Sequence, residues 1–247
     1  MWWVFILYLF VITFAEAVVS FYDPSYGMVF HSIILVSLLT FSALKRGENP
    51  VSNLFLSLSL APLIRITSLS MPLTYFPRFA WYLVASVPVL AAELALMRVQ
   101  GLGLKDVGIT FRRPLAQVGL ALIGIPFGVV EYFILRPEPL VIGLSVEGLA
   151  VLAVVLVFST GFVEELVFRG IMQHSATQTF GDAGIIGVAV VFAVLHLGWL
   201  SPLDIIFVFS IGLFFSYVTL KMGSIVGASL SHGITNVVLF LVMPFIT

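Results

Sequence analysis

The chain contains no cysteine. Disulfide bonds, thiolate metal sites and a cysteine nucleophile are therefore excluded. Charge is also scarce: Asp, Glu, Lys and Arg make up only 9% of the residues, whereas soluble domains contain about 25%. The net charge of −1 offers no positive excess to attract nucleic acid, so we expect no nucleic-acid partner.

The sequence consists mostly of long apolar runs. Hydrophobic residues make up 61% of the 247 residues, and a transmembrane helix needs about 20 of them in a row. Such runs predict spans near residues 2–22, 27–44, 51–71, 79–97, 114–135, 147–180, 184–199, 202–220 and 224–245. The run 184–199 is short, so eight full spans and one partial helix are as good an interpretation as nine spans. The predicted fold class is all-α, a polytopic membrane helix bundle with about eight to nine spans.

Basic residues in the short loops predict the orientation of this bundle. Lys45 and Arg46 fall in one loop, and Arg98, Lys105 and two further arginines fall in the stretch 98–113. Two spans separate these loops, so both lie on one side, which the positive-inside rule assigns to the cytoplasm. The N-terminus is then cytoplasmic as well. The first residues, Met-Trp-Trp, lack the basic region of a signal peptide, so we expect the first apolar run to be a retained span.

The most informative polar feature is a pair of adjacent glutamates. Glu164 and Glu165 lie in the run Val151–Met172, which is otherwise apolar enough for the bilayer. An ionised side chain at membrane depth costs at least about 2.5–3.5 kcal/mol, and two neighbouring acids also repel each other. Arg169 lies one helical turn after Glu165 and can pair with it. We expect such groups to persist only where partners neutralise them or chemistry uses them.

Two further polar pairs lie in later apolar runs, Phe192 with His196 and His232 with Asn236. Taken alone, a buried histidine is more often a hydrogen-bonded core residue, and polar side chains in membrane helices more often join neighbouring helices. His232 and Asn236 are four residues apart and share one face of a helix. A functional role for both pairs depends on whether they meet the two glutamates.

The spacing along the chain allows that meeting. If the helices 147–180 and 184–199 are antiparallel and turn near residue 181, Glu164 precedes the turn by about 17 residues and His196 follows it by about 15. At 1.5 Å per residue, their depths then differ by only about 3 Å. Continued through the next two turns, the same count puts the histidine and the amide of the last helix within about one to two helical turns of that depth. The spacing therefore predicts two carboxylates, two imidazoles and a carboxamide at one level.

This ordered set resembles the CAAX-processing and bacteriocin-immunity superfamily of intramembrane proteases, called CPBP or Abi. The family motif EExxxR is matched by Glu164, Glu165 and Arg169, the motif FxxxH by Phe192 and His196, and the motif HxxxN by His232 and Asn236. The resemblance covers about residues 100–245. It predicts a protease core at residues 101–247 and leaves residues 1–100 as N-terminal transmembrane helices of unassigned role.

The resemblance implies a glutamate-dependent endopeptidase similar to type II CAAX prenyl endopeptidases, which cleaves near the C-terminus of a lipidated or membrane protein. Glu164 would be the general base that activates water, and His196 would assist it. His232 and Asn236 would stabilise the oxyanion. This chemistry is coherent, since a carboxylate in a site of low dielectric can accept a proton near neutral pH, and donors aimed at a developing charge act strongly where water is scarce.

The same resemblance assigns supporting roles and partners. Glu165 and Arg169 are expected to form an ion pair that keeps the neighbouring glutamate oriented, with Phe192 as a further supporting residue. No cofactor is expected. The expected partners are the lipid bilayer and a membrane-associated peptide or protein substrate, prenylated or not.

Three other interpretations stay open. The glutamates and Arg169 could form a buried ion network without chemistry. A metalloprotease could use Glu164, His196 and His232 as a zinc site with open coordination, although the sequence contains no HExxH motif. A non-enzymatic immunity, scaffold or transport protein could use the same groups as a proton relay.

Five polar residues outside these motifs give further expectations. Glu16 and Arg65 lie at similar depths in the first and third spans, and we predict that they pair. Glu93 and Glu131 lie near the ends of predicted spans, where we expect them to reach the membrane interface. His31 matches no motif and is expected to be structural.

Overall fold

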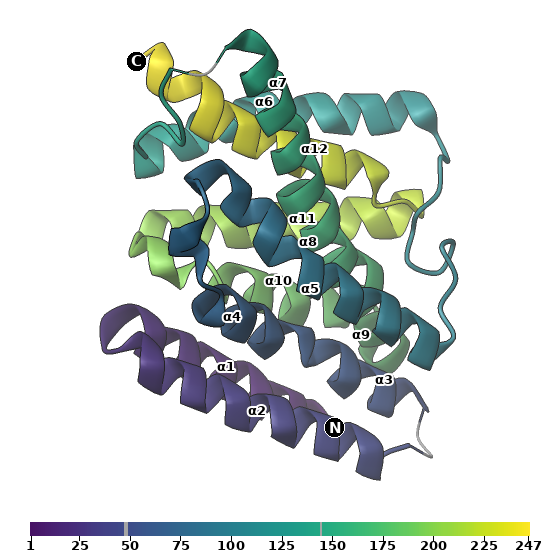
Figure 1. The fold of residues 1–247 in the computed structure, drawn as a ribbon. Helices are drawn as coiled ribbons and strands as arrows, with labels where there is room; N and C mark the ends of the chain where they lie inside the picture. The colour runs from purple at the N-terminus through teal and green to yellow at the C-terminus, as the bar shows by residue number, and fades with distance from the viewer. Residues whose placement is uncertain (47–48, 144) are drawn as a thin grey trace.

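The computed structural model describes residues 1–46, 49–143 and 145–247. No strand occurs among these residues, so the predicted all-α fold class is confirmed. The helices, coloured in Figure 1 from purple at the N-terminus to yellow at the C-terminus, are α1 (Trp2–Phe21), α2 (Pro24–Leu44), α3 (Asn49–Leu58), α4 (Leu60–Ser70), α5 (Arg78–Gln100), α6 (Pro114–Leu135), α7 (Val146–Leu156), α8 (Val163–Glu165), α9 (Gln173–Phe180), α10 (Gly184–Val194), α11 (Pro202–Met222) and α12 (Val226–Val237). Short 3₁₀ turns are η1 (Leu73–Tyr75), η4 (Gly181–Ala183), η5 (Leu197–Trp199) and η7 (Met243–Phe245).

Eight helical segments in the described part of the chain are long and apolar enough to cross a membrane. One of them, Val146–Trp199, has 54 residues and changes direction at Gly181, where φ is 62°. The helix that follows, α10, has 11 residues and so extends about 16 Å, roughly half of the hydrocarbon core. The structure therefore supports eight long spans with one partial helix. The predicted helix 184–199 is too long, because α10 ends at Val194.

Local sequence explains where several helices begin and end. Before α2, Oδ1 of Asp23 accepts a hydrogen bond from the backbone N–H of Ser25 at 2.7 Å, and the proline between them suits the first helical position. Ser201 caps α11 in the same way and accepts from the N–H of Asp204 at 3.2 Å. Gly223 ends α11 with a φ of 65°, a left-handed conformation that glycine adopts easily.

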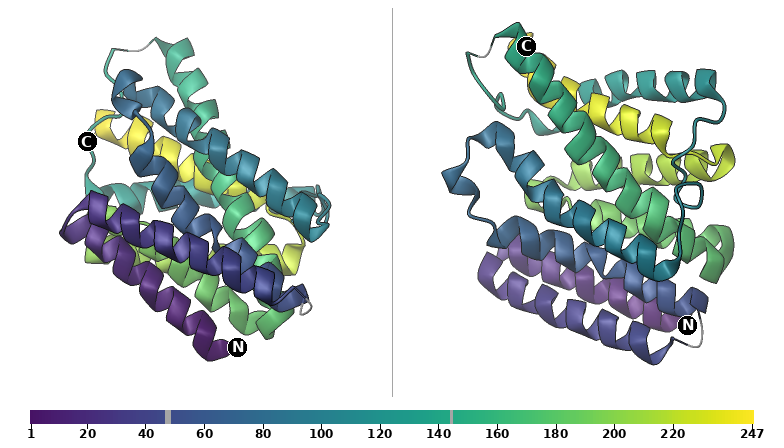
Figure 2. Two further views of the ribbon diagram at one scale, coloured as in Figure 1. Left: turned by 60° about the horizontal axis from the view of Figure 1, so that its bottom comes forward. Right: turned by 45° about the vertical axis from the view of Figure 1, so that its right-hand side comes forward.

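One long helix runs obliquely through the bundle from Val146 to Phe180 (Figure 1). It consists of α7, α8 and α9, which are joined by two π-helical stretches, η2 (Val157–Phe162) and η3 (Leu166–Met172). The stretch η2 packs against α5 and α12, and α6 packs against α12. The hairpin of α1 and α2 forms one edge of the bundle and packs against α3, α4 and α10 (Figure 2). The middle of the long helix is thus enclosed by helices from both halves of the chain.

The predicted pair of Glu16 and Arg65 is confirmed, and it joins three helices. Nε of Arg65 lies 2.9 Å from both carboxylate oxygens of Glu16, and Nη2 lies 2.8 Å from Oε2. His31 on α2 is also fully buried and places Nε2 3.3 Å from Oε1 of Glu16. A carboxylate in a dry interior needs such neutralisation, which explains why these charges share one place.

The expectation for Glu93 and Glu131 is wrong, since both are buried rather than interfacial. Helix α5 continues to Gln100, so Glu93 lies two turns inside the helix and faces the bundle. Glu131 lies one turn before the end of α6, but its side chain turns inward and lines a cavity at the level of the glutamate pair. Span boundaries alone do not determine the direction in which a side chain points.

Candidate active site

The two adjacent glutamates have opposite surroundings. Successive residues of a helix point in different directions, so one side chain can face a neighbour while the other faces open space. The side chain of Glu165 is fully buried, whereas 34% of the side chain of Glu164 is exposed. The space beside Glu164 is a cavity of about 150 Å³. The sequence pattern thus places one carboxylate in a packed interior and its neighbour where water or a ligand can reach it.

Glu165 is neutralised by Arg169, as predicted. Nη1 of Arg169 donates to Oε1 of Glu165 at 2.9 Å, and both side chains are fully buried. The guanidinium group also lies over the ring of Phe192, 4.2 Å from its centroid, and donates to the backbone carbonyl of Gly212 at 3.3 Å. A cation on an aromatic face is stabilised most where it is desolvated. This geometry explains why the supporting set contains a phenylalanine as well as an ion pair.

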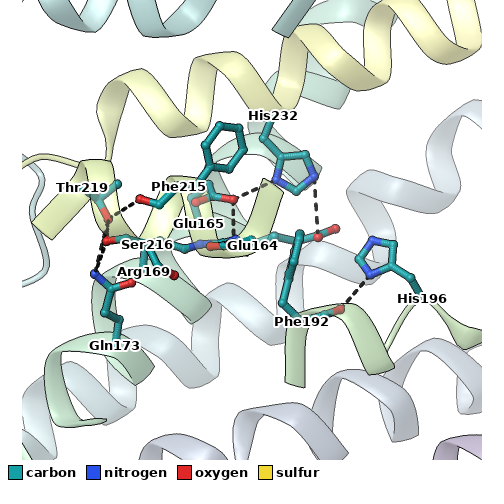
Figure 3. Close-up of polar contacts among 11 residues, drawn as sticks. Glu164, Glu165, Arg169, Gln173, Phe192, His196, Phe215, Ser216, Thr219 and His232 are labelled. Carbon is teal, nitrogen blue, oxygen red and sulfur yellow. Dashed lines mark hydrogen bonds and ion pairs between the residues drawn. The ribbon is translucent and has the colours of Figure 1, made fainter. Parts of the chain in front are cut away.

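His232 bridges the two glutamates, as Figure 3 shows. Its Nδ1 lies 3.0 Å from Oε1 of Glu165, and its Nε2 lies 3.9 Å from Oε2 of Glu164. The buried carboxylate accepts, so a ring proton lies on Nδ1. The longer distance to Glu164 exceeds that of a hydrogen bond. His232 is therefore fixed through one nitrogen and presents the other to the cavity and to Glu164.

His196 lies in a turn two residues after α10 ends. The last carbonyls of a helix have no intrahelical partner, and the carbonyl of Phe192 is satisfied by Nδ1 of His196, which donates at 2.8 Å. A carbonyl can only accept, so the proton of the neutral imidazole lies on Nδ1 and Nε2 carries a lone pair. The four-residue spacing of the FxxxH motif thus sets the tautomer of the histidine.

Asn236 faces the same cavity from α12. Its Nδ2 donates to Oγ1 of Thr160 at 2.8 Å, and that hydroxyl in turn donates to the carbonyl of Leu156 at 2.6 Å. The chain of two hydrogen bonds fixes the amide plane of Asn236. One N–H of the amide remains for a ligand, because a carboxamide carries two.

Irregular helix geometry surrounds the site. The π-helical stretches η2 and η3 flank Glu164 and Glu165 on both sides, and a third, η6 (Val238–Val242), follows Asn236. Such stretches are rare and concentrate at functional sites. A close approach of η2 to α12 brings the two faces together: a Cβ on Gly161 would overlap the carbonyl of Ser229, and it would lie 2.8 Å from the backbone nitrogen of Gly233.

The structure brings most of the predicted site residues to one cavity. Its walls include Glu164, Phe192, His196, His232 and Asn236, while the pair of Glu165 and Arg169 lies behind them. Sequence reasoning missed the other residues of these walls, among them Tyr82, Glu131, Thr160 and Trp199. Thr160 could have been found, because it lies four residues before Glu164 and so shares its helix face. Nothing in the local pattern around Tyr82 marks it.

The zinc alternative requires three protein ligands around one point. A catalytic zinc needs three protein ligands at about 2.0–2.2 Å, yet within residues 1–46, 49–143 and 145–247 no group of three His, Asp or Glu side chains is placed to hold a metal ion. Nε2 of His232 and Oε2 of Glu164 stand 3.9 Å apart, and the described residues do not add a third ligand to this pair.

The fold and the site together define a helical membrane protein with a carboxylate–imidazole centre inside the bundle. Residues 146–238 match the family described as Type II CAAX prenyl endopeptidase Rce1-like. Over this segment, the match confirms the predicted resemblance to the CAAX protease family. It contains every motif residue from Glu164 to Asn236. No curated protein and no solved structure shows significant similarity to the chain.

Proposed function

We propose that this protein is an intramembrane endopeptidase that cleaves a membrane-associated protein near its C-terminus, with Glu164 as the general base. The observation that carries the proposal is the contrast between the two glutamates. Glu165 is fully buried and paired, whereas Glu164 is 34% exposed to a cavity that two histidines and an amide also line. The family match supports the same reaction class.

In the proposed reaction, a water molecule lies between Glu164 and Nε2 of His196. Glu164 takes one proton as the water oxygen attacks the scissile carbonyl carbon, and the lone pair of His196 orients the water. The carbonyl oxygen becomes an oxyanion, which the free N–H of Asn236 and a proton on Nε2 of His232 stabilise. Carboxylates beside both nitrogens of His232 allow that ring to hold two protons. Glu164 then returns its proton to the leaving nitrogen as the C–N bond breaks.

The same proposal includes the location of the protein, its cofactors and the route of its substrate. The eight apolar helices and the family match support an integral membrane protein, and we propose that its N-terminus lies in the cytoplasm, on the evidence of the basic loops. No metal or other cofactor takes part. The substrate would reach the cavity from the bilayer or its surface, as a lipidated or membrane-anchored tail.

The test is a comparison of cells that contain the wild-type protein with cells that contain Glu164→Ala. Mass spectrometry of membrane and lipidated proteins would identify C-terminal peptides in both. We expect at least one protein to be trimmed near its C-terminus only with the wild-type enzyme. Identical C-terminal peptides in both cell types, at equal levels of the two variants, would contradict the proposal.

Proton transport is a second candidate, because two buried carboxyl groups have no role in the mechanism. Glu93 and Asp204 are both fully buried, and neither carboxyl group has a hydrogen-bond partner among the described residues. Acidic residues of this kind occur in proton relays. Proton uptake into vesicles that contain the purified protein, lost in Glu93→Gln and in Asp204→Asn, would favour transport over hydrolysis.

A further inference from the structure

Arg65 links the N-terminal helices to the active-site turn. Besides its pair with Glu16, Nη2 of Arg65 donates to the backbone carbonyl of Leu195 at 2.7 Å. Leu195 lies directly before His196 and follows the end of α10, where carbonyls lack helical partners. A residue of α4, outside the segment that matches the family, thus holds the turn that carries an active-site histidine.

Arg65 also lines a second cavity, of about 270 Å³, which reaches the active site. Glu164 and His196 line this cavity as well as the first one, and so do Tyr82, Thr160 and Trp199. Glu164 therefore lies where the two cavities meet. A substrate whose scissile peptide bond lies at Glu164 could place the chain before the bond in one cavity and the chain after it in the other.

The walls of the two cavities differ in chemistry. Away from the shared residues and the motif, the first is lined mainly by aromatic and aliphatic side chains, among them Phe207, Ile211 and Leu239. The second contains Arg65, and no other Lys or Arg of the described chain lines it. Its serine and threonine hydroxyl groups, including those of Ser68 and Ser86, donate to carbonyls of their own helices. The guanidinium group is thus the charged donor that the second cavity offers to a ligand.

Part of that guanidinium group is unused. Arginine carries five N–H groups in a planar fork, and Nε and Nη2 of Arg65 are occupied by Glu16 and Leu195. Within the described residues, Nη1 makes no hydrogen bond. The side chain is 17% exposed, although the carboxylate that it pairs with is fully buried. One edge of the fork is therefore fixed by the protein, while Nη1 is left for a ligand.

We propose that the second cavity takes the C-terminal end of the substrate and that Nη1 of Arg65 binds its terminal carboxylate. The inference rests on the proposed function and assigns to it a specificity-determining residue, which would recognise a free α-carboxylate close to the scissile bond. A CAAX tail is of this kind, because its last residue lies three positions after the cysteine. Guanidinium groups bind carboxylates with directed, charge-assisted hydrogen bonds.

The first experiment needs no variant. A prenylated peptide with a free C-terminal carboxylate and the same peptide with a C-terminal amide are compared as substrates of the purified wild-type protein. Loss of a charge-assisted hydrogen bond should raise KM for the amide by about 10- to 100-fold, with kcat changed much less. Equal KM values for the two peptides would overturn the proposal.

Variants then test whether Arg65 causes the discrimination. The double variant Glu16→Gln with Arg65→Gln removes both buried charges together, so no unpaired carboxylate remains to unfold the protein. Its KM ratio of amide to acid should fall to about one, whereas Arg98→Gln, an exposed arginine outside both cavities, should keep the wild-type ratio. A wild-type ratio in the double variant would refute the role of Arg65.

A binding measurement separates this inference from the proposed reaction. Calorimetry with Glu164→Gln, which is expected to be inactive, would measure the affinity of the acid and amide peptides without turnover. Tighter binding of the acid peptide, lost when the Glu16→Gln and Arg65→Gln changes are added, supports the inference. This holds even if the wild-type protein cleaves neither peptide, because absence of cleavage would count against the proposed endopeptidase and not against the carboxylate site. Equal affinity of both peptides would refute the carboxylate site and leave the proposed reaction standing.

Discussion

Replacement of Glu165 by glutamine should destabilise the fold strongly. The change keeps the shape of the side chain but removes the charge that faces Arg169 at 2.9 Å, where both side chains are fully buried. Breaking a buried ion pair by removing one partner costs about 3–5 kcal/mol, because the remaining charge is uncompensated. That is about a fifth or more of a typical total stability of about 5–15 kcal/mol.

The assay is thermal unfolding of the purified protein in detergent. For a chain of this size, 1 kcal/mol corresponds to about 2–4 °C in Tm, so Glu165→Gln should lower Tm by about 6–20 °C. Glu138→Gln is a matched control, because Glu138 is exposed in the loop between α6 and α7. It should leave Tm within about 2 °C, as surface changes usually do.

A second variant tests the cause of this loss. If the unpaired guanidinium group is responsible, adding Arg169→Met to Glu165→Gln should recover at least half of the lost Tm, since removal of both charges is often close to neutral. A Glu165→Gln protein as stable as the wild type would refute the ion-pair role. A double variant no more stable than the single one would show that the unpaired charge is not the cause.

Three further predictions concern the geometry and chemistry of the site. Gly161→Ala should lower Tm and abolish cleavage, because the added Cβ would push η2 away from α12. Gly119→Ala, where nothing lies within 4 Å of the added Cβ, should do neither, and cleavage by Gly161→Ala would contradict the close approach of η2 to α12. Thr160→Ala should lower kcat by about 10- to 100-fold, as loss of an orienting partner commonly does, with rescue by Thr160→Ser; unchanged kcat would show that Asn236 needs no such support. Cleavage should survive exhaustive chelation, and stoichiometric zinc whose removal stops cleavage and whose return restores it would favour the metalloprotease alternative.

The helices and the motif contacts were predictable because they depend on short-range rules. Apolar runs of about 20 residues form spans in any bilayer protein. The pair of Glu165 and Arg169 follows from a spacing of four residues on one helix. The pairing of Glu16 with Arg65 followed from depth, since isolated charges within a membrane bundle tend to meet.

Other features depend on long-range packing that a single sequence does not reveal. His196 was expected on a helix, but α10 ends at Val194 and the histidine lies in the following turn. Glu131 was expected at the interface, yet it faces the cavity, because the inward direction of its side chain is set by the packing of α6 on α12. The contribution of Tyr82 was invisible, since α5 meets η2 only in the folded bundle.

The most direct test of the central claim is the cleavage rate of Glu164→Gln with a prenylated C-terminal peptide. Glutamine keeps the shape of the side chain but cannot accept the proton of water, and the exposed side chain makes no hydrogen bond within the described residues that the change would break. The account predicts a Tm within a few degrees of the wild type and no detectable product by mass spectrometry. A folded Glu164→Gln protein that cleaves the peptide at the wild-type rate would contradict the claim that Glu164 activates water.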